Sequence, residues 1–214
     1  MDRSIRTGKE SDDVRARILA TAEGLFRRVG HHRTSVADIA AELGMSPANI
    51  YRFFPSRVAI EESICGHLLN EIIEVASSIA RTDMRAAEKL AQLLTTVHHH
   101  TTTMLIEAKP MHDLIVIAIQ ENWPVVQTHV RQILVILEAI IREGVEAGEF
   151  DVQDATQAAQ QVRFAFMFFF YPAVVELHAG RETDIQASMI AQISFILKAL
   201  GDAGEVMRGG YGQV

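Results

Sequence analysis

Residues 34–57, TSVADIAAELGMSPANIYRFFPSR, carry the signals that decide how the N-terminal part of this chain folds. Ser35, followed three residues later by Asp38, is typical of a capping box, so we expect a helix to begin here. Apolar residues then recur at helical spacing, at Val36, Ile39, Ala40 and Leu43. Gly44 follows the last of them and can adopt the left-handed conformation that ends a helix. The pattern predicts a helix that stops at a tight turn.

A second short helix is predicted directly after this turn. Ser46 can cap it, Pro47 suits its first helical position, and Pro55 prevents it from continuing. The residues expected to face outward are Ala48, Asn49, Tyr51 and Arg52. Two short helices joined in this way form a helix-turn-helix, an arrangement that many proteins use to enter the major groove of DNA. The same arrangement also occurs in helical bundles that bind no nucleic acid.

The outward residues have the chemistry that DNA contact requires. An asparagine side chain matches the edge of adenine, and alanine or proline can touch the methyl group of thymine. Tyrosine and arginine side chains can reach phosphate groups. On these grounds the residues expected to contact DNA are Pro47, Ala48, Asn49, Tyr51, Arg52, Arg57 and, in the preceding loop, Arg33.

Residues 15–60 resemble the N-terminal domain of the TetR family of transcriptional regulators. The resemblance includes the entry TSVADIA at 34–40 and the exit IYRFFPS at 50–56, and both motifs are specific in order and spacing. It covers roughly a quarter of the chain. The resemblance implies a three-helix DNA-binding head followed by a variable, all-helical body that binds a ligand and forms a dimer.

The resemblance also implies roles for individual residues. Contact with phosphate is implied for Thr34 and Ser35, a place in or beside the major groove for Ser46, Pro47, Ala48, Asn49 and Arg52, and contact with the DNA backbone for Tyr51 and Arg57. Many members carry a basic residue and a glycine where this chain has Pro47 and Ala48. The bases that this chain reads therefore cannot be inferred from a relative.

The distribution of charge agrees with a DNA-binding head. The chain of 214 residues has a formal net charge of -7. Residues 1–60 nevertheless hold ten Lys or Arg and seven Asp or Glu, a balance of +3, whereas residues 61–214 hold ten and twenty, a balance of -10. A basic head attracts DNA and an acidic body repels it, which would restrict contact to the head. The excess of acidic residues in the body is also explained by solubility alone.

The sequence as a whole predicts an all-α fold of about nine helices, with 49% apolar residues and no strand signal. The helices are expected at about 13–29, 35–43, 47–53, 56–80, 84–108, 111–122, 123–147, 152–178 and 184–200. We expect a flexible arm at 1–13, the helix-turn-helix domain at 14–55, the helical body at 56–200 and a flexible tail at 201–214. The long helix after Pro55 would transmit movement of the body to the head as a stiff element.

The last two helices are expected to form the dimer. Residues 164–175 are apolar on nearly every side, so more than one face must be covered. A homodimer through a four-helix bundle would cover them and would suit the two-fold symmetry of DNA half-sites. The interface residues expected on this basis are Phe164, Phe168, Val175, Met189, Ile193, Ile196 and Leu197.

A ligand cavity is expected between the middle helices of the body. Apolar and aromatic residues with a few polar groups are typical of such cavities, and an aromatic or hydrophobic small molecule would be the natural effector. The residues expected to line it are His99, Thr103, Met111, Ile115, Trp123, Phe166, Phe170 and Tyr171. Each of these residues also suits the ordinary packed core of a helical protein.

No metal ligand and no cofactor is assigned. The run His98–His100 does not form a metal site by itself, because consecutive helical residues point about 100° apart. Assembly of His99, His112 and His129 from different helices is a remaining possibility. His31 and His32 are given no role, and the adjacent Glu61 and Glu62 are interpreted as a solvated face.

A cytoplasmic setting is expected. The single cysteine, Cys65, cannot form an internal disulfide, and no signal-like segment precedes the first helix. The longest uncharged apolar run in the C-terminal half, residues 164–175, is too short to span a bilayer, so no membrane association is expected.

The sequence is compatible with three functions. The first is a ligand-responsive transcriptional regulator, most simply a repressor that binds palindromic operator DNA as a homodimer and is released by an effector. The second is an all-helical, metal-assisted enzyme, although no catalytic residue can be named because no nucleophile elbow or phosphate-binding glycine loop is present in the sequence. The third is a DNA-binding regulator without a ligand.

Overall fold

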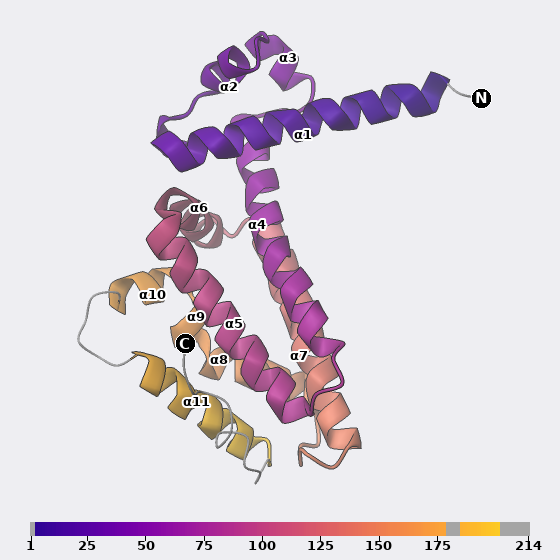
Figure 1. Cartoon of the computed structure of the whole chain (residues 1–214), viewed down its shortest axis with the longest axis vertical. Helices are drawn as coiled ribbons and strands as arrows, with labels where there is room; N and C mark the ends of the chain where they lie inside the picture. The colour runs from indigo at the N-terminus through magenta and orange to yellow at the C-terminus, as the bar shows by residue number, and fades with distance from the viewer. Residues whose placement is uncertain (1–2, 179–184, 202–214) are drawn as a thin grey trace. The chain divides into compact units, whose positions relative to one another are not determined.

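The computed structural model describes residues 3–178 and 185–201, and within these ranges every regular element is helical (Figure 1). The elements are α1 (Arg3–Val29), the 3-10 helix η1 (His31–Arg33), α2 (Val36–Glu42), α3 (Pro47–Tyr51), α4 (Arg57–Ala80), α5 (Ala86–Glu107), α6 (Lys109–Gln120), α7 (Pro124–Glu146), α8 (Ala155–Ala165), α9 (Met167–Phe170), α10 (Pro172–His178) and α11 (Ile185–Ala199). The all-α fold class is confirmed.

The single helix expected over 152–178 is wrong, because the structure divides it into α8, α9 and α10. Phe166 ends α8, and Tyr171 has extended backbone angles (φ -75°, ψ 113°) immediately before Pro172. Proline disfavours the helical conformation in the residue that precedes it, so the break at Tyr171 follows from the sequence. These extra breaks raise the described number of α-helices from the expected nine to eleven.

The N-terminal arm expected at residues 1–13 is also corrected, because α1 begins at Arg3. No proline interrupts residues 3–13, so the helix of the following residues can continue toward the N-terminus. The flexible tail expected at 201–214 lies, apart from Gly201, outside the described residues.

The described residues divide into two compact units that do not follow the expected boundary at residues 55 and 56. The first unit combines the described residues up to Leu69 with Met104–Val126, and the second combines Asn70–Thr103 with the described residues from Gln127 onward. The helix α6 therefore belongs to the same unit as α1, α2 and α3. The long helix α4 contributes residues to both units.

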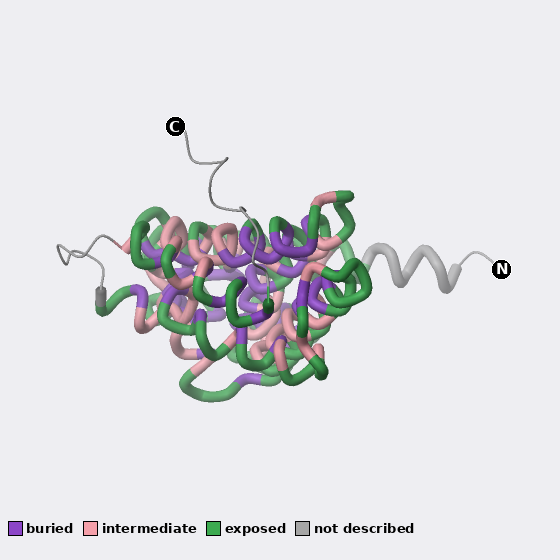
Figure 2. The backbone as a smooth tube through the Cα atoms, turned by 90° about the horizontal axis from the view of Figure 1, so that it is seen from below, coloured by how far each residue is buried: buried purple, intermediate pink, exposed green. Residues whose placement is uncertain are grey.

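The core of the first unit explains why α6 belongs to it. Ile18, Phe26 and Ile50 are fully buried, and Met111 and Leu114 of α6 are buried in the same cluster. Figure 1 shows α2 and α3 next to α1, and Figure 2 shows the buried sides of the helices in purple. Each fully buried side chain of this size contributes about 1.5–3 kcal/mol to stability.

The second unit is built on α5, α7, α8 and α11 around another apolar cluster. Its buried members include Leu90, Leu137, Ile141 and Phe166. Lys89 on α5 is also buried, and its Nζ donates to both carboxylate oxygens of Glu143 on α7, at 2.6 and 2.7 Å. A charge can be buried there because a carboxylate meets it directly.

The helix α7 is, among the described helices, the one that is long and apolar enough to cross a membrane by length and composition. Core helices of soluble proteins meet the same criterion, and α7 places Leu137, Ile140 and Ile141 in the core of the second unit. Its opposite side carries the exposed charged residues Arg131 and Arg142. This two-sided character is that of a packed helix.

Candidate nucleic-acid interface

The capping box expected at the start of α2 is confirmed. The Ser35 Oγ accepts a hydrogen bond from the Asp38 backbone N–H at 3.1 Å, and an Asp38 carboxylate oxygen accepts one from the Ser35 N–H at 2.8 Å. Hydrogen bonds from the Ser35 side chain and backbone lower the pKa of Asp38. The carboxylate also suits the positive end of the helix dipole, so α2 has a fixed starting point.

The turn and the second helix also form as the sequence predicted. Gly44 has φ +65°, the left-handed conformation that glycine adopts at low cost. The Ser46 Oγ accepts a hydrogen bond from the Asn49 N–H at 3.3 Å, and Pro47 occupies the start of α3. Ile50 is fully buried between the helices. The short α3 is therefore held by its cap and by one buried anchor.

Two arginines of α1 attach the helix-turn-helix to the rest of the first unit. Arg15 donates to the Phe53 carbonyl, and its guanidinium carbon lies 4.3 Å from the centre of the Phe54 ring. Arg28 forms an ion pair with Glu42 at the end of α2, at 3.6 Å. These contacts fix both ends of the α2–α3 pair against α1, which is the rigidity that a recognition element needs.

Most of the residues expected to contact DNA lie on the surface of the first unit. Arg33, Ser35, Ser46, Pro47, Ala48, Asn49, Tyr51 and Arg52 are all exposed. Ser35 and Ser46 have hydroxyl groups that already serve as caps. The side chains without such a task on α3 and at its end are Asn49, Tyr51 and Arg52, which present an amide, a phenol and a guanidinium together.

Thr34 and Arg57 are placed differently from the other eight. Thr34 is 2% exposed, and its hydroxyl donates to the Gly30 carbonyl at 3.0 Å. Arg57 donates to the His31 carbonyl and, at 2.8 Å, to Glu61. Both side chains therefore stabilise the loop before α2 in this conformation, and their contacts with phosphate stay predictions.

The sequence reasoning missed the polar cluster around His31 and Glu61, which holds this loop against α4. His31 is 4% and Glu61 7% exposed, and the His31 Nδ1 lies 3.4 Å from a Glu61 carboxylate oxygen. Burial lowers the pKa of His31, and the hydrogen bond with Glu61 opposes this only in part. The interpretation of Glu61 as solvated is wrong, because its position one turn after Arg57 places it under the loop. The signal available in the sequence was an Arg and a Glu four residues apart, at Arg57 and Glu61.

In the second unit, a cavity of about 60 Å³ lies between α5, α7 and the end of α8. Of the eight residues expected to line a ligand cavity, Phe166 and Phe170 line this one. Met111, Ile115 and Trp123 are instead buried in the core of the first unit, where the Trp123 Nε1 donates to Glu121 at 2.9 Å. His99, Thr103 and Tyr171 do not line this cavity. Two of the eight residues therefore line this void, and a ligand-binding role for any of the eight stays a prediction.

The expected dimer residues include a correction. Met189, Ile193, Ile196 and Leu197 are at most 4% exposed within the single chain, and Val175 is also buried. The four residues of α11 belong to the core cluster of their own unit, and all five have almost no surface left to lose on dimerisation. Phe164 and Phe168 are exposed, at 52% and 43%. On α11 the exposed aromatic residue is Phe195, at 65%, which lies on the side opposite to the face that the sequence favoured.

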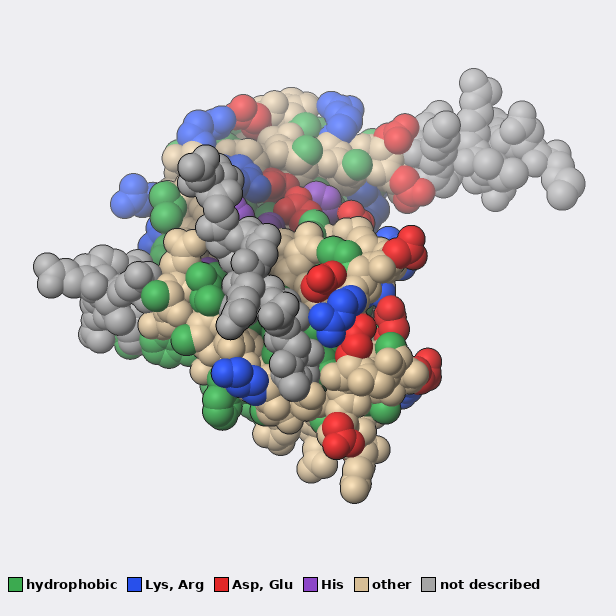
Figure 3. Space-filling view, turned by 60° about the horizontal axis from the view of Figure 1, so that its bottom comes forward, with side chains coloured by type: hydrophobic (Ala, Val, Ile, Leu, Met, Phe, Trp, Pro, Cys, Tyr) green, Lys and Arg blue, Asp and Glu red, His purple; other side chains and the backbone are tan. Residues whose placement is uncertain are grey.

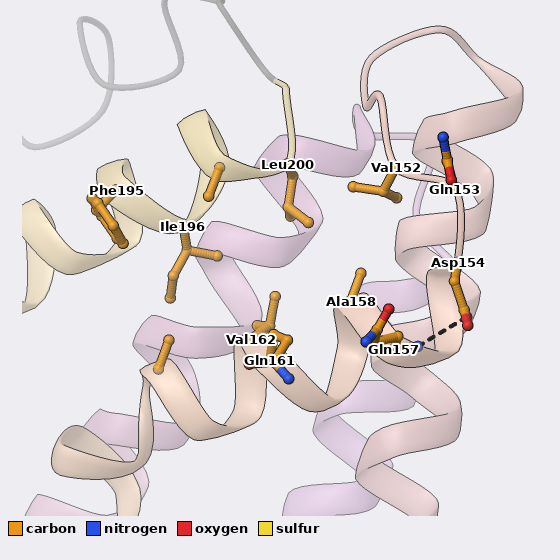
Figure 4. Close-up of a pocket in the computed structure, with 12 residues that line it drawn as sticks. Val152, Gln153, Asp154, Gln157, Ala158, Gln161, Val162, Phe195, Ile196 and Leu200 are labelled. Carbon is orange, nitrogen blue, oxygen red and sulfur yellow. Dashed lines mark hydrogen bonds between the residues drawn. The ribbon is translucent and has the colours of Figure 1, made fainter.

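An open groove of about 510 Å³ runs beside Phe195, between α8 and α11 (Figure 4). Ile196 and Leu200 lie on one side of it and Ala158 and Val162 on the other, with Gln157 and Gln161 at its edge. Elsewhere on the surface drawn in Figure 3, hydrophobic side chains lie next to acidic and basic ones. The groove is thus mostly apolar, with Gln153 and Asp154 also in its lining, and it lies beside an exposed phenylalanine, which is typical of a contact surface.

The comparisons with known proteins agree with this architecture. Residues 18–64 match the family model described as bacterial regulatory proteins, tetR family, and residues 86–191 match the model described as tetracyclin repressor-like, C-terminal domain. No curated protein sequence gives a significant match.

Solved structures with the same fold cover most of the chain. A transcriptional regulator of the TetR/AcrR family from Thermobifida fusca is 24% identical, with a TM-score of 0.65 over 86% of this chain and 97% of that one. SmeT, the repressor of the Stenotrophomonas maltophilia multidrug efflux pump SmeDEF, is 18% identical, with a TM-score of 0.67 over 92% and 94%.

FadR from Bacillus subtilis, solved in complex with stearoyl-CoA, is 19% identical, with a TM-score of 0.62 over 85% of this chain and 97% of that one. At these identities the likeness concerns the fold. The two family models cover the head and most of the body, and the capped helix-turn-helix lies within the residues that the tetR family model matches. The chain belongs to the TetR family of transcriptional regulators.

Proposed function

We propose that this chain is a ligand-responsive repressor that acts in the cytoplasm, binds palindromic operator DNA as a homodimer, and is released from it by a small effector. The observation that carries the proposal is the exposed surface of α3, where Asn49, Tyr51 and Arg52 stand together on a helix fixed by its cap and by Ile50. The proposal assigns no catalytic step to any residue.

The chemistry of α3 supports direct contact with bases. Pro47 and Ala48 at the start of the helix are small and apolar, so they suit the methyl groups of thymine. Asn49 can pair its amide with an adenine edge, and Arg52 can donate to guanine or to phosphate. Tyr51 is 50% exposed, which suits a contact from its hydroxyl to the DNA backbone.

The groove between α8 and α11 supports the homodimer. Phe195 is too exposed to contribute to the core of its own chain, and a second copy would bury it. We propose an interface formed by Phe195, Phe164 and Phe168 around this groove, in place of the buried face of α11. A two-fold dimer would present two copies of α3 to half-sites about 34–36 Å apart, or a multiple of that spacing.

Response to a ligand is supported by the cavity in the second unit and by one relative, and repression is supported by another. SmeT is a repressor, and FadR was solved with stearoyl-CoA bound. The helix α4 begins at Arg57, which holds the loop before α2, and continues without interruption to Ala80. A ligand that binds one conformation of the body better than another would lower operator affinity by that difference in binding free energy.

The DNA part of the proposal is tested by binding to a palindromic fragment from the adjacent intergenic region, measured by fluorescence anisotropy. Asn49→Ala and Arg52→Ala should each weaken specific binding by about 5- to 100-fold, which corresponds to about 1–3 kcal/mol. The matched control is Arg142→Ala, which removes an exposed arginine from α7 that pairs with Glu138. Unchanged affinity in both α3 variants would refute the assignment.

The dimer is tested by size-exclusion chromatography with light scattering. Phe195→Glu should yield monomers at micromolar concentration, because a carboxylate would have to be buried in the interface. The control is Val135→Glu on α7, since Val135 is also 65% exposed but does not line the groove. A dimeric Phe195→Glu variant, or a monomeric wild-type protein, would refute the proposed interface.

A further inference from the structure

The cavity between α5, α7 and α8 has a mostly apolar lining that includes two polar residues. The buried residues of this lining are Leu93, Leu94, Leu137 and Phe166. The residues around it that retain partial exposure include Arg163 and His129, the two polar residues of the lining. A ligand that enters would therefore meet two polar side chains, Arg163 and His129, among eight apolar ones.

Arg163 is the unusual member of this lining. Its Nε is shielded from solvent and has no hydrogen-bond partner among the described residues. Its guanidinium carbon lies 4.4 Å from the centre of the Phe164 ring, which holds the planar group in place without satisfying its hydrogen bonds. A shielded donor on a charged group is costly unless an acceptor meets it.

Lys89, a buried cation of the same unit, has a carboxylate partner within the chain. Lys89 is more buried than Arg163, and the carboxylate of Glu143 meets it at 2.6 Å. No described carboxylate forms an ion pair with Arg163, and no acidic residue lines the cavity. The Nε of Arg163 is thus a donor that a negatively charged group from outside the chain could satisfy.

We propose that the effector is an amphipathic organic anion whose carboxylate is bound by Arg163, with His129 beside it, and whose apolar part occupies the cavity. Guanidinium groups bind carboxylates through two parallel N–H donors, so the head group would be oriented as well as attracted. This inference rests on the proposed function, because it names the ligand class for the effector site of the regulator.

The cavity must widen to admit such a ligand. Its volume of about 60 Å³ is small, since each water molecule occupies about 30 Å³ in the liquid. Ile133 and Phe170 at its edge are only half-buried, so their side chains have room to move outward. A second void of about 20 Å³, lined by His100, shares Leu93 and Val97 with the first. Movement of Val97 would join the two voids and extend the apolar part.

The test compares three probes of equal chain length, octanoate, 1-octanol and octylamine, by isothermal titration calorimetry with the full-length protein. Octanoate should bind at least about 10-fold more tightly than octanol, which is the value of a typical charge-assisted hydrogen bond, and octylamine should bind most weakly. Arg163→Gln should remove the preference for octanoate over octanol and leave octanol binding within about 2-fold of wild type. Ile133→Trp, which fills the cavity with a larger side chain, should weaken the binding of octanoate and of octanol.

The matched control is Arg131→Gln, which removes an exposed arginine of α7 that donates to Thr128 and does not line the cavity. This variant should keep the preference for octanoate. Equal binding of the three probes to the wild-type protein, binding of none of them, or an unchanged preference in Arg163→Gln would overturn the proposal. Operator binding by the same proteins is measured separately. A wild-type protein that binds octanoate as expected but binds no operator DNA would refute the proposed regulatory function and leave the ligand class standing.

Discussion

The ring of Phe150 lies so close to Gly144 that a Cβ atom at Gly144 would be 2.2 Å from the Cδ2 of the ring. The same Cβ would be 2.9 Å from the Cβ of Ala86 at the start of α5. Phe150 is 4% exposed, so its ring cannot move into solvent to make room. The absence of a side chain at Gly144 is what allows α7, α5 and Phe150 to pack in the second unit.

Gly144→Ala should therefore destabilise the protein by about 1–3 kcal/mol, the usual cost of overpacking. The measurement is urea-induced unfolding followed by circular dichroism. The control is Gly24→Ala in α1, where a Cβ would have no atom within 4 Å and alanine should stabilise the helix by about 0.5–1 kcal/mol. If both variants are stabilised, the close packing at Gly144 is refuted.

The buried pair of Lys89 and Glu143 predicts an asymmetric result. Glu143→Ala leaves a buried ammonium without a carboxylate and should cost about 2 kcal/mol, between the values for exposed and fully buried pairs because Glu143 is itself half exposed. Lys89→Met should be close to neutral, since methionine fills the same space without a charge.

Both changes are measured as differences in the free energy of unfolding. Glu138→Ala, which breaks the more exposed pair with Arg142, is the control and should cost less than about 0.5 kcal/mol. If Glu143→Ala lowers the free energy of unfolding no more than Glu138→Ala does, the pairing of Lys89 with Glu143 does not stabilise the protein.

The two shielded histidines, His31 and His100, predict that stability falls in acid. Burial lowers the pKa of both, with Glu61 opposing the shift for His31 and Glu71 for His100. At acidic pH the folded state then binds fewer protons than the unfolded state. The free energy of unfolding is therefore not reduced by these two histidines above the unfolded pKa of about 6.5. It declines as the pH falls below that value.

Unfolding free energies at pH 7.5 and pH 5.5 check this sign. His31→Gln and His100→Gln should each reduce the loss of stability between the two pH values. His67→Gln changes an exposed imidazole on α4 that does not contribute to either shift, and it should leave the loss unchanged. A wild-type protein that is more stable at pH 5.5 than at pH 7.5 would contradict the prediction.

Cys65 should be unreactive in the folded protein. It is fully buried in the first unit, and burial raises the pKa of its thiol to about 12, with the charge of Glu62 adding to the shift. Because the thiolate is the reactive species, a thiol reagent at pH 8 should label the native protein only as it opens. Labelling should be immediate in denaturant, and equally rapid labelling of the native protein would show that the site is accessible.

Local signals in the sequence predicted the helix-turn-helix well. Ser35 and Asp38 form the expected reciprocal cap, and Gly44 adopts the expected left-handed conformation. Such features depend on residues three or four positions apart, so the sequence contains all the information that they need. The exposure of Asn49 and Arg52 follows from the same local geometry.

The predictions that failed depend on long-range packing. The apolar stripe of α11 is clear in the sequence, but the stripe alone does not say whether Ile193 faces its own chain or a second copy. Glu61 was assigned to solvent because the loop that covers it is 30 residues away in the sequence. Trp123 was assigned to a ligand cavity, whereas it is buried with residues of α6 in the core of the first unit.

The shared core of α1 and α6 has a practical consequence for protein engineering. A fragment that ends near residue 60 would contain every proposed DNA contact, but it would expose the apolar side of α1 that Met111 and Leu114 cover. Chimeric biosensors that join this reading head to a foreign sensor should therefore carry Met104–Val126 along with the N-terminal segment. The smallest transplantable part of this protein is discontinuous in its gene.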